Sequence, residues 1–235
     1  MWRTMRYVFW IVSASLSVEA AEKPRPTEKF RGGTVEWARL KHSGGYWNRH
    51  AESDDAMISY MRAATTLNIG SEWCSAAASD LGEMTRYPFL FADTLQHLSA
   101  SEKQNLVEYL KRGGFIFIDA CCNNSINPSG REFLFNHLKI LQGMLPGLEV
   151  EVLDPSHEVF SIYFKMQAYP PQSRPGGTTW SNGPTFPLRS LKFNGRVVGM
   201  LSISGLQCGW ARMGRQDATP FVQMMANIYL YAITH

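Results

Sequence analysis

The sequence lacks clustered charge, long apolar runs and the common nucleotide-binding motifs. Its 23 basic and 20 acidic residues are spread over 235 positions, with no run of Lys or Arg that would follow a phosphate backbone, so nucleic acid is not an expected partner. No apolar stretch reaches the about 20 residues that a membrane-spanning helix needs. The absence of Gly-x-Gly-x-x-Gly, P-loop and Gly-x-Ser-x-Gly motifs leaves dinucleotide binding, nucleotide hydrolysis and serine esterase chemistry without support. The composition, 45% hydrophobic and 18% charged, is that of one globular domain.

Residues 1–20 have the pattern of a secretory signal peptide. Arg3 and Arg6 precede an apolar run over 7–16, and Val18-Glu19-Ala20 places small residues where a signal peptidase reads them. A retained membrane anchor is the alternative. We expect cleavage after Ala20, a secreted or periplasmic protein without a transmembrane anchor, a linker over 21–33 and a single α/β domain over 34–235.

Cysteine is scarce, with four residues: Cys74, Cys121, Cys122 and Cys208. The predicted export would place them in an oxidising compartment. There an even number favours disulfides over free thiols. A bridge between the neighbours Cys121 and Cys122 would distort the peptide unit, so one of them paired with Cys208 is preferred. The cysteines and His157 lack Cys-x-x-Cys and His-x-x-x-His spacing, so neither a metal nor another cofactor is expected.

Strands and helices alternate along the chain, which predicts an α/β sandwich with a mainly parallel sheet. Capping boxes, Ser99 with Glu102 and Ser129 with Glu132, mark two helix starts. Leu134, Leu138, Leu141 and Leu145 are expected to form the buried face of the second of these helices. Residues 156–194, rich in Pro and Gly, are expected to form loops and a hairpin at one edge. The other expected elements are strands at 35–40, 87–91, 115–118 and 197–203, and helices at 54–64 and 219–232.

Ligands of open parallel sheets bind outside the carboxyl ends of the strands, and Asp119, Cys121, Cys122 and Asn123 directly follow the strand at 115–118. A cysteine nucleophile there requires a base, and the candidate imidazole is His157. The residues around Cys121 are larger than a nucleophile elbow allows. Disulfides or buried thiols are therefore the alternative to catalysis.

Three further segments carry candidate binding residues. Trp210 and Arg212 follow the strand at 197–203, where they can stack on a ring and clamp a carboxylate, or Trp210 can cap the core. The loop containing Trp47 and Asn48 can receive an anion at the start of a helix, or it is a surface turn. His157 lies on a Pro-containing turn, where a local hydrogen-bonding role is the alternative.

An ordered set of short motifs resembles the bacterial domain of unknown function 4159 family. The motifs are Arg39-Leu40-Lys41, Gly44-Gly45-Tyr46-Trp47-Asn48, Tyr87-Pro88-Phe89-Leu90, Gly113-Gly114-Phe115, Asp119-Ala120-Cys121-Cys122, His157 and Cys208-Gly209-Trp210. The resemblance implies a flavodoxin-like three-layer sandwich, similar to class I glutamine amidotransferase-like domains and to ThuA-like proteins, with no established reaction.

The same resemblance shapes the expected function. Asp119 stands where the ThuA-like pattern has His, and the flanking glycines and His-x-Glu pair of the amidotransferase pattern are missing. We therefore expect a non-catalytic protein that binds an unknown small molecule, such as a carbohydrate, or a cell-envelope component. The expected ligand-binding residues are Asp119, Asn123, His157, Trp210, Arg212, Trp47 and Asn48. The alternative is a Cys-dependent hydrolase or amidotransferase that uses Cys121 or Cys122 with His157.

Overall fold

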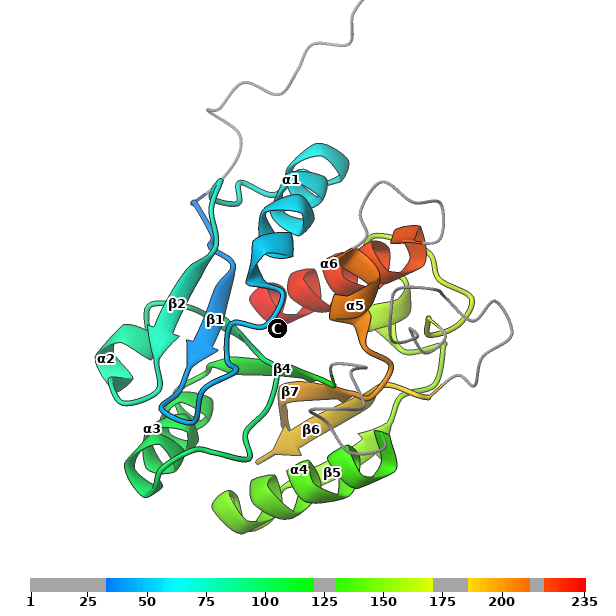
Figure 1. Cartoon of the computed structure of the whole chain (residues 1–235). Helices are drawn as coiled ribbons and strands as arrows, with labels where there is room; N and C mark the ends of the chain where they lie inside the picture. The colour runs from blue at the N-terminus through cyan, green and yellow to red at the C-terminus, as the bar shows by residue number, and fades with distance from the viewer. Residues whose placement is uncertain (1–32, 121–129, 171–185, 212–217) are drawn as a thin grey trace, which may run out of the picture.

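A computed structural model describes residues 33–120, 130–170, 186–211 and 218–235, which form one mixed sheet with helices on both faces (Figure 1). The sheet has seven strands in the order β2-β1-β3-β4-β7-β6-β5. The strands are β1 (Ala38–Lys41), β2 (Cys74–Ala77), β3 (Phe89–Ala92), β4 (Phe115–Asp119), β5 (Glu149–Val152), β6 (Arg189–Phe193) and β7 (Arg196–Ser202).

Pairing is parallel from β2 to β7, and β6 is antiparallel to both of its neighbours. After β1 the chain adds β2 on one side, and it then returns to add β3 on the other side. The direction of winding therefore reverses between β1 and β3, which makes their carboxyl ends the topological switch point of the sheet.

The helices form one layer on each face of the sheet (Figure 1). The first layer contains α1 (Asp54–Ala64), α5 (Leu206–Trp210) and α6 (Thr219–Thr234). The second contains α2 (Leu81–Met84), α3 (Ala100–Lys111) and α4 (Gly130–Met144). Two short 3-10 helices, η2 (Ala51–Ser53) and η3 (Glu158–Phe160), lie in the connections.

Side chains of the central strands alternate between the two helical layers, because successive residues of a strand point to opposite faces. Phe115 and Phe117 of β4 belong to the core cluster shared with α1 and α6. Ile116 and Ile118 belong to the cluster shared with α3 and α4. Burial on both faces explains why this strand is an uninterrupted apolar run.

The predicted α/β class, the mainly parallel sheet and most of the predicted elements are confirmed. The helix over 54–64 has the predicted bounds, and the Ser99–Glu102 capping box starts α3. The final helix buries Phe221, Val222, Met225, Ile228, Tyr229 and Ala232, as predicted.

Some predicted bounds were wrong. The strand predicted at 87–91 spans Phe89–Ala92, since Pro88 has no N–H for the ladder. The strand predicted at 35–40 spans Ala38–Lys41. The predicted leucine face of α4 is partly confirmed, since Leu141 and Leu145 are buried and Leu134 and Leu138 are partly buried against the core. Phe133 and His137 are also buried there, because His137 finds hydrogen-bond partners in the interior. The strands β2 and β5 were not predicted, because Cys74–Ala77 and Glu149–Val152 are short and only partly buried.

Among the described residues, no helix is both long enough and apolar enough to cross a membrane. Residues 1–32, which include the predicted signal peptide and nearly all of the predicted linker, lie outside the described residues.

Substituting Gly209 by Ala should destabilise the fold, because a Cβ there would lie 2.1 Å from Cγ of Phe221 on α6. Overpacking of this kind costs about 1 to 3 kcal/mol. Gly143 of α4 is the matched control, since a Cβ there would meet nothing within 4 Å, and Gly143→Ala should stabilise by about 0.5 to 1 kcal/mol. Urea unfolding of both variants measures the difference, and equal midpoints would contradict the close packing of α5 on α6.

Candidate functional site

Two neighbouring strands lead into buried aspartates at their carboxyl ends, and the next strand, β1, carries a buried arginine on the same side of the sheet, which faces α1 and α5. Arg39 lies in β1, Asp93 directly follows β3, and Asp119 ends β4. Phe91 is in register with Phe117, so the same register places Asp93 beside Asp119. Because the two aspartates follow the paired residues Ala92 and Ile118, both lie at the switch-point edge.

Arg39 is fully buried and forms a bidentate ion pair with Asp54 at the start of α1. Its Nε lies 2.5 Å from Oδ2 and its Nη2 lies 2.7 Å from Oδ1 of that carboxylate. Trp37 Nε1 also donates to Asp54, at 2.7 Å. Arg39 Nη1 lies 3.4 Å from Oδ2 of Asp93, and the guanidinium carbon is 4.8 Å from the centre of the Phe91 ring. The pair therefore joins β1, β3 and α1.

The loop Gly44–His50 is attached to this network through the carbonyl oxygen of Arg49. Arg39 Nη1 donates to that oxygen at 3.0 Å, and Gln207 Nε2 of α5 donates to it at 2.6 Å. The backbone N–H of Gln207 donates to Oδ2 of Asp119 at 2.9 Å. Gln207 therefore joins the loop to Asp119, so the structure brings two predicted site segments to one edge of the sheet.

Local backbone geometry gives this loop a defined shape. Gly45, Tyr46 and His50 have φ angles of 71°, 59° and 54°, in the left-handed region that most side chains avoid. A Cβ at Gly44 would lie 2.0 Å from Cβ of His97, so the loop packs closely where glycine stands. The two glycines of the motif are therefore needed for the conformation of the loop.

The side chain of Arg49 is the group in this cluster that most clearly indicates a ligand-binding site. Its Nε and Nη1 are buried, and within the described part of the chain neither donates a hydrogen bond. Oε1 of Gln207 is also buried and accepts no hydrogen bond from any described residue. Because leaving a buried charged donor without an acceptor is costly, an acceptor group bound here would be stabilised.

Tyr169 places a hydroxyl next to Asp119. Burial raises the pKa of Tyr169, the charge of Asp119 raises it further, and a hydrogen-bonding interaction with Ser202 opposes this rise. The phenol is therefore protonated at neutral pH and can donate a hydrogen bond at the carboxyl ends of β4 and β7.

Trp47 and Asn48 lie in the Gly44–His50 loop near this cluster. Trp47 is half-buried, with its ring 6.3 Å from that of Trp73, and the Nζ of Lys41 lies 5.7 Å from its ring centre. Asn48 is exposed. Both residues are accessible for contact with a ligand at this edge.

The ring of Trp210 lies in the core, which was the alternative to ligand stacking. It is fully buried and meets the rings of Trp37 at 5.8 Å and Phe91 at 5.5 Å in edge-on geometry. Our expectation that this ring stacks on a ligand is therefore wrong in this conformation, because aromatic neighbours occupy its surroundings.

His157 lies away from the aspartates. Its Nδ1 accepts a hydrogen bond from the backbone N–H of Val159 at 3.2 Å, and its ring is 5.5 Å from that of Tyr231 near the end of α6. Tyr231 in turn contacts Phe115, the first residue of β4, whereas Asp119 is the last. The local hydrogen-bonding role, which was the alternative, is the one that the structure shows.

Four predicted site residues, Cys121, Cys122, Asn123 and Arg212, lie outside the described residues, so the proposed nucleophile remains a prediction. The two described cysteines, Cys74 and Cys208, do not form a disulfide with each other. The Sγ of Cys74 is 3.7 Å from Oε2 of Glu36. The described part of the chain contains no group of three or more His, Cys, Asp or Glu residues placed to hold a metal ion.

The sequence reasoning missed His137, a fully buried imidazole that ties α4 to the loop after β3. Its Nδ1 lies 2.8 Å from the carbonyl oxygen of Phe133, to which it donates, and its Nε2 accepts from Leu95 N at 3.0 Å. Thr94 Oγ1 is 3.2 Å from the same Nε2. The only sequence signal was its spacing of four from Phe133 and Leu141 on the buried face of α4.

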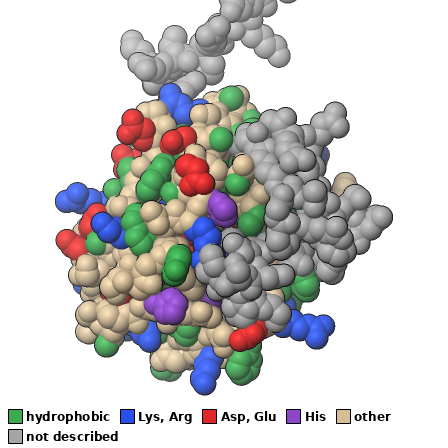
Figure 2. Space-filling view, viewed as in Figure 1, with side chains coloured by type: hydrophobic (Ala, Val, Ile, Leu, Met, Phe, Trp, Pro, Cys, Tyr) green, Lys and Arg blue, Asp and Glu red, His purple; other side chains and the backbone are tan. Residues whose placement is uncertain are grey.

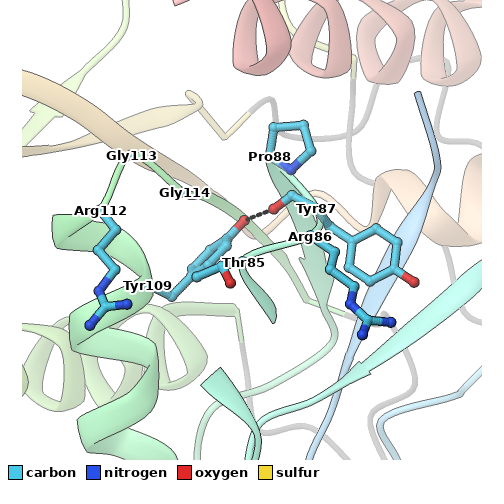
Figure 3. A pocket seen from close by; sticks show the side chains of 8 residues that line it. All are labelled: Thr85, Arg86, Tyr87, Pro88, Tyr109, Arg112, Gly113 and Gly114. Carbon is cyan, nitrogen blue, oxygen red and sulfur yellow. Dashed lines mark hydrogen bonds between the residues drawn. The ribbon is translucent and has the colours of Figure 1, made fainter. Parts of the chain in front are cut away.

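The opposite, amino edge of the sheet has a hollow of about 260 Å³ that lies between β3 and the end of α3 (Figure 3). Tyr109 lies in it between the exposed side chains of Arg86 and Arg112 (Figure 3). Its hydroxyl lies 3.0 Å from the carbonyl oxygen of Tyr87 and 3.1 Å from that of Phe115. Because this hydroxyl is already hydrogen-bonded, the hollow is a weaker candidate site.

Charged side chains of both signs are scattered over the described surface that faces the viewer in Figure 2. That face therefore presents no broad area of one charge that would attract a polyanion.

Replacing Arg39 by Met should destabilise the protein strongly, because Asp54 and Asp93 would keep buried charges without their cationic partner. The expected loss is about 3 to 5 kcal/mol in the free energy of unfolding. Arg86→Met is the control, since this arginine is exposed and its replacement should change stability by less than about 0.5 kcal/mol. Similar urea midpoints for the two variants would show that the buried pair contributes little.

His137 should make stability depend on pH. Burial lowers its pKa from 6.5 to about 4, although the hydrogen bond to Phe133 opposes the shift. The unfolded chain therefore binds more protons between these values, and stability that is complete above pH 6.5 is lost as the pH falls toward 4. The loss should be roughly 3 kcal/mol.

The measurement is urea unfolding at several pH values in that window. His137→Gln should flatten the pH dependence, whereas His97→Gln, which replaces an exposed imidazole, should retain it. If the unfolding free energy of His137→Gln depended on pH as steeply as that of the unaltered protein, another group would be responsible for the pH dependence.

Comparison with known families assigns nearly the whole chain to one family. No curated protein matches the sequence. A family model described as "Domain of unknown function (DUF4159)" matches residues 36–233, which include every described strand and all of the cluster at the carboxyl edge. The chain therefore belongs to the DUF4159 family.

Proposed function

We propose that this protein binds a small polar ligand at the carboxyl edge of the sheet, between the Gly44–His50 loop, the two aspartates and α5. The observation that carries the proposal is the half-buried side chain of Arg49, whose buried Nε and Nη1 donate to no described residue while its backbone is held by Arg39 and Gln207. A rigid backbone with an unused charged donor is a preorganised site for an acceptor.

The neighbouring groups define the chemistry of the ligand. Arg49 favours a carboxylate or phosphoryl oxygen, because the guanidinium forms charge-assisted hydrogen bonds with such acceptors. Asp93 and Asp119 favour hydroxyl or amine groups, which can donate to carboxylates. The ligand class that suits both is a small molecule with an acidic group and nearby hydroxyl or amino groups.

The winding of the sheet supports this location. The site lies where the strand order reverses, between β1 and β3, and ligands of open α/β sheets bind at such points. The order β2-β1-β3-β4-β7 also supports a flavodoxin-like architecture, with similarity to class I glutamine amidotransferase-like and ThuA-like domains.

The proposal includes export. The basic residues, apolar run and small residues within positions 1–20 support cleavage of a signal peptide and action in the periplasm or outside the cell, on a small molecule or a cell-envelope component. An oxidising compartment would also allow a disulfide between Cys208 and Cys121 or Cys122.

A thermal-shift screen of amino acids, sugar acids and amino sugars tests the binding site. A bound compound at one hundred times its Kd should stabilise by about 2.7 kcal/mol and raise Tm by about 5 to 10 °C. Arg49→Met should lose most of this rise, because the cationic donor is removed. Arg86→Met, at the opposite edge of the sheet, should keep it. A full rise in Arg49→Met would contradict the proposed site.

A further inference from the structure

A separate pocket of about 430 Å³ opens at the carboxyl ends of β1 and β2, against the first turn of α3. It lies on the opposite face of the sheet from Arg49. Successive side chains of a strand point to opposite faces, so His42 points to the same face as Ala38 and Leu40, which pack toward α3. Its lining residues are Lys41, His42, Ser43, Ala77, Ser79, Ser99 and Glu102.

His42 is the residue that indicates a ligand. Its side chain is almost completely buried, with 4% of the residue exposed, yet neither ring nitrogen has a hydrogen-bond partner among the described residues. Burial lowers the pKa of His42, Glu102 raises it and His97 lowers it. The ring is therefore neutral at neutral pH, and it offers one N–H donor and one nitrogen acceptor to the pocket.

The carboxylate of Glu102, by contrast, is already stabilised by hydrogen bonds from neighbouring residues. Its two carboxylate oxygens accept hydrogen bonds from Ser43 N at 2.7 Å, Ser43 Oγ at 2.8 Å and Ser99 N at 2.7 Å. Lys41 precedes His42 and therefore points to the other face of the sheet, where its Nζ lies 5.7 Å from the ring centre of Trp47. Besides the hydrogen-bonded Glu102, the polar side chains that line the pocket are therefore serine hydroxyls and the imidazole.

We propose that this pocket is a second binding site, for a small neutral molecule that carries several hydroxyl groups. Hydroxyl groups both donate and accept, so they can satisfy both nitrogens of His42 and the serine oxygens. An anionic ligand would be repelled by Glu102, and a cationic one gains little there because three hydrogen bonds already stabilise that carboxylate. The volume lies within the range of small-molecule sites.

The test uses the full chain with ¹⁵N-labelled histidine and three probes of similar shape, D-glucose, D-glucuronate and D-glucosamine. Glucose should shift the ring ¹⁵N signals of His42 in a saturable way, glucuronate should bind about tenfold more weakly, and glucosamine should bind no more tightly than glucose. Unchanged His42 signals with glucose, or tighter binding of either charged probe, would overturn the proposal.

Matched variants locate the site. His42→Phe should abolish glucose binding, and Ser79→Leu should weaken it at least about tenfold by narrowing the pocket from its exposed rim. His97→Gln, which changes a nearby imidazole outside the lining, should bind glucose as the unaltered protein does. Full affinity in Ser79→Leu and in a folded His42→Phe would overturn the proposal. Because Arg49 is unchanged in every variant, the result is independent of the function proposed above.

Discussion

The buried ion pair between Arg39 and Asp54 is the interaction on which the carboxyl edge of this protein depends. Both side chains are fully removed from water, which is costly for two charges, and the cost is offset by bidentate geometry and by the indole N–H of Trp37. One guanidinium thereby joins a central strand to the first helix. The same group reaches Asp93 and the carbonyl oxygen of Arg49. Replacing the pair with apolar residues would keep the core but would remove one of the two side-chain donors that hold the Gly44–His50 loop, leaving Gln207 alone.

A single strand explains why this edge has two distinct polar sites. Arg39 of β1 points toward α1, and His42, directly after the strand, continues the alternation and points toward α3. The first side carries charged groups in a network, and the second carries a neutral imidazole among hydroxyls. The sheet separates the two sites, so they can differ in the ligands they accept although only a few residues of sequence separate them.

The elements predicted best were those whose side-chain pattern is local. Helix α3 was recognisable from its capping box, and β4 from an apolar run that is buried on both faces. Strand β2 could not be recognised, since Cys74–Ala77 is partly exposed and becomes a strand by pairing with β1. The short helix α5 was missed for a similar reason, because contacts with α6 hold it and its five residues carry little pattern.

The features of the candidate site also separate into those with a local sequence pattern and those that depend on distant contacts. The sequence by itself determined the α/β class, the position of Asp119 at a strand end and the presence of a glycine-containing loop before α1, because each depends on neighbours within a few residues. Only the tertiary structure decided that Trp210 belongs to the core, that His157 packs near the end of α6, and that Arg39, Arg49 and Gln207 converge with Asp119. Those outcomes depend on partners far away in the sequence, such as Gln207 and Arg49, which are 158 positions apart. A buried charge or hydrogen bond is stable only where such a partner is brought into reach.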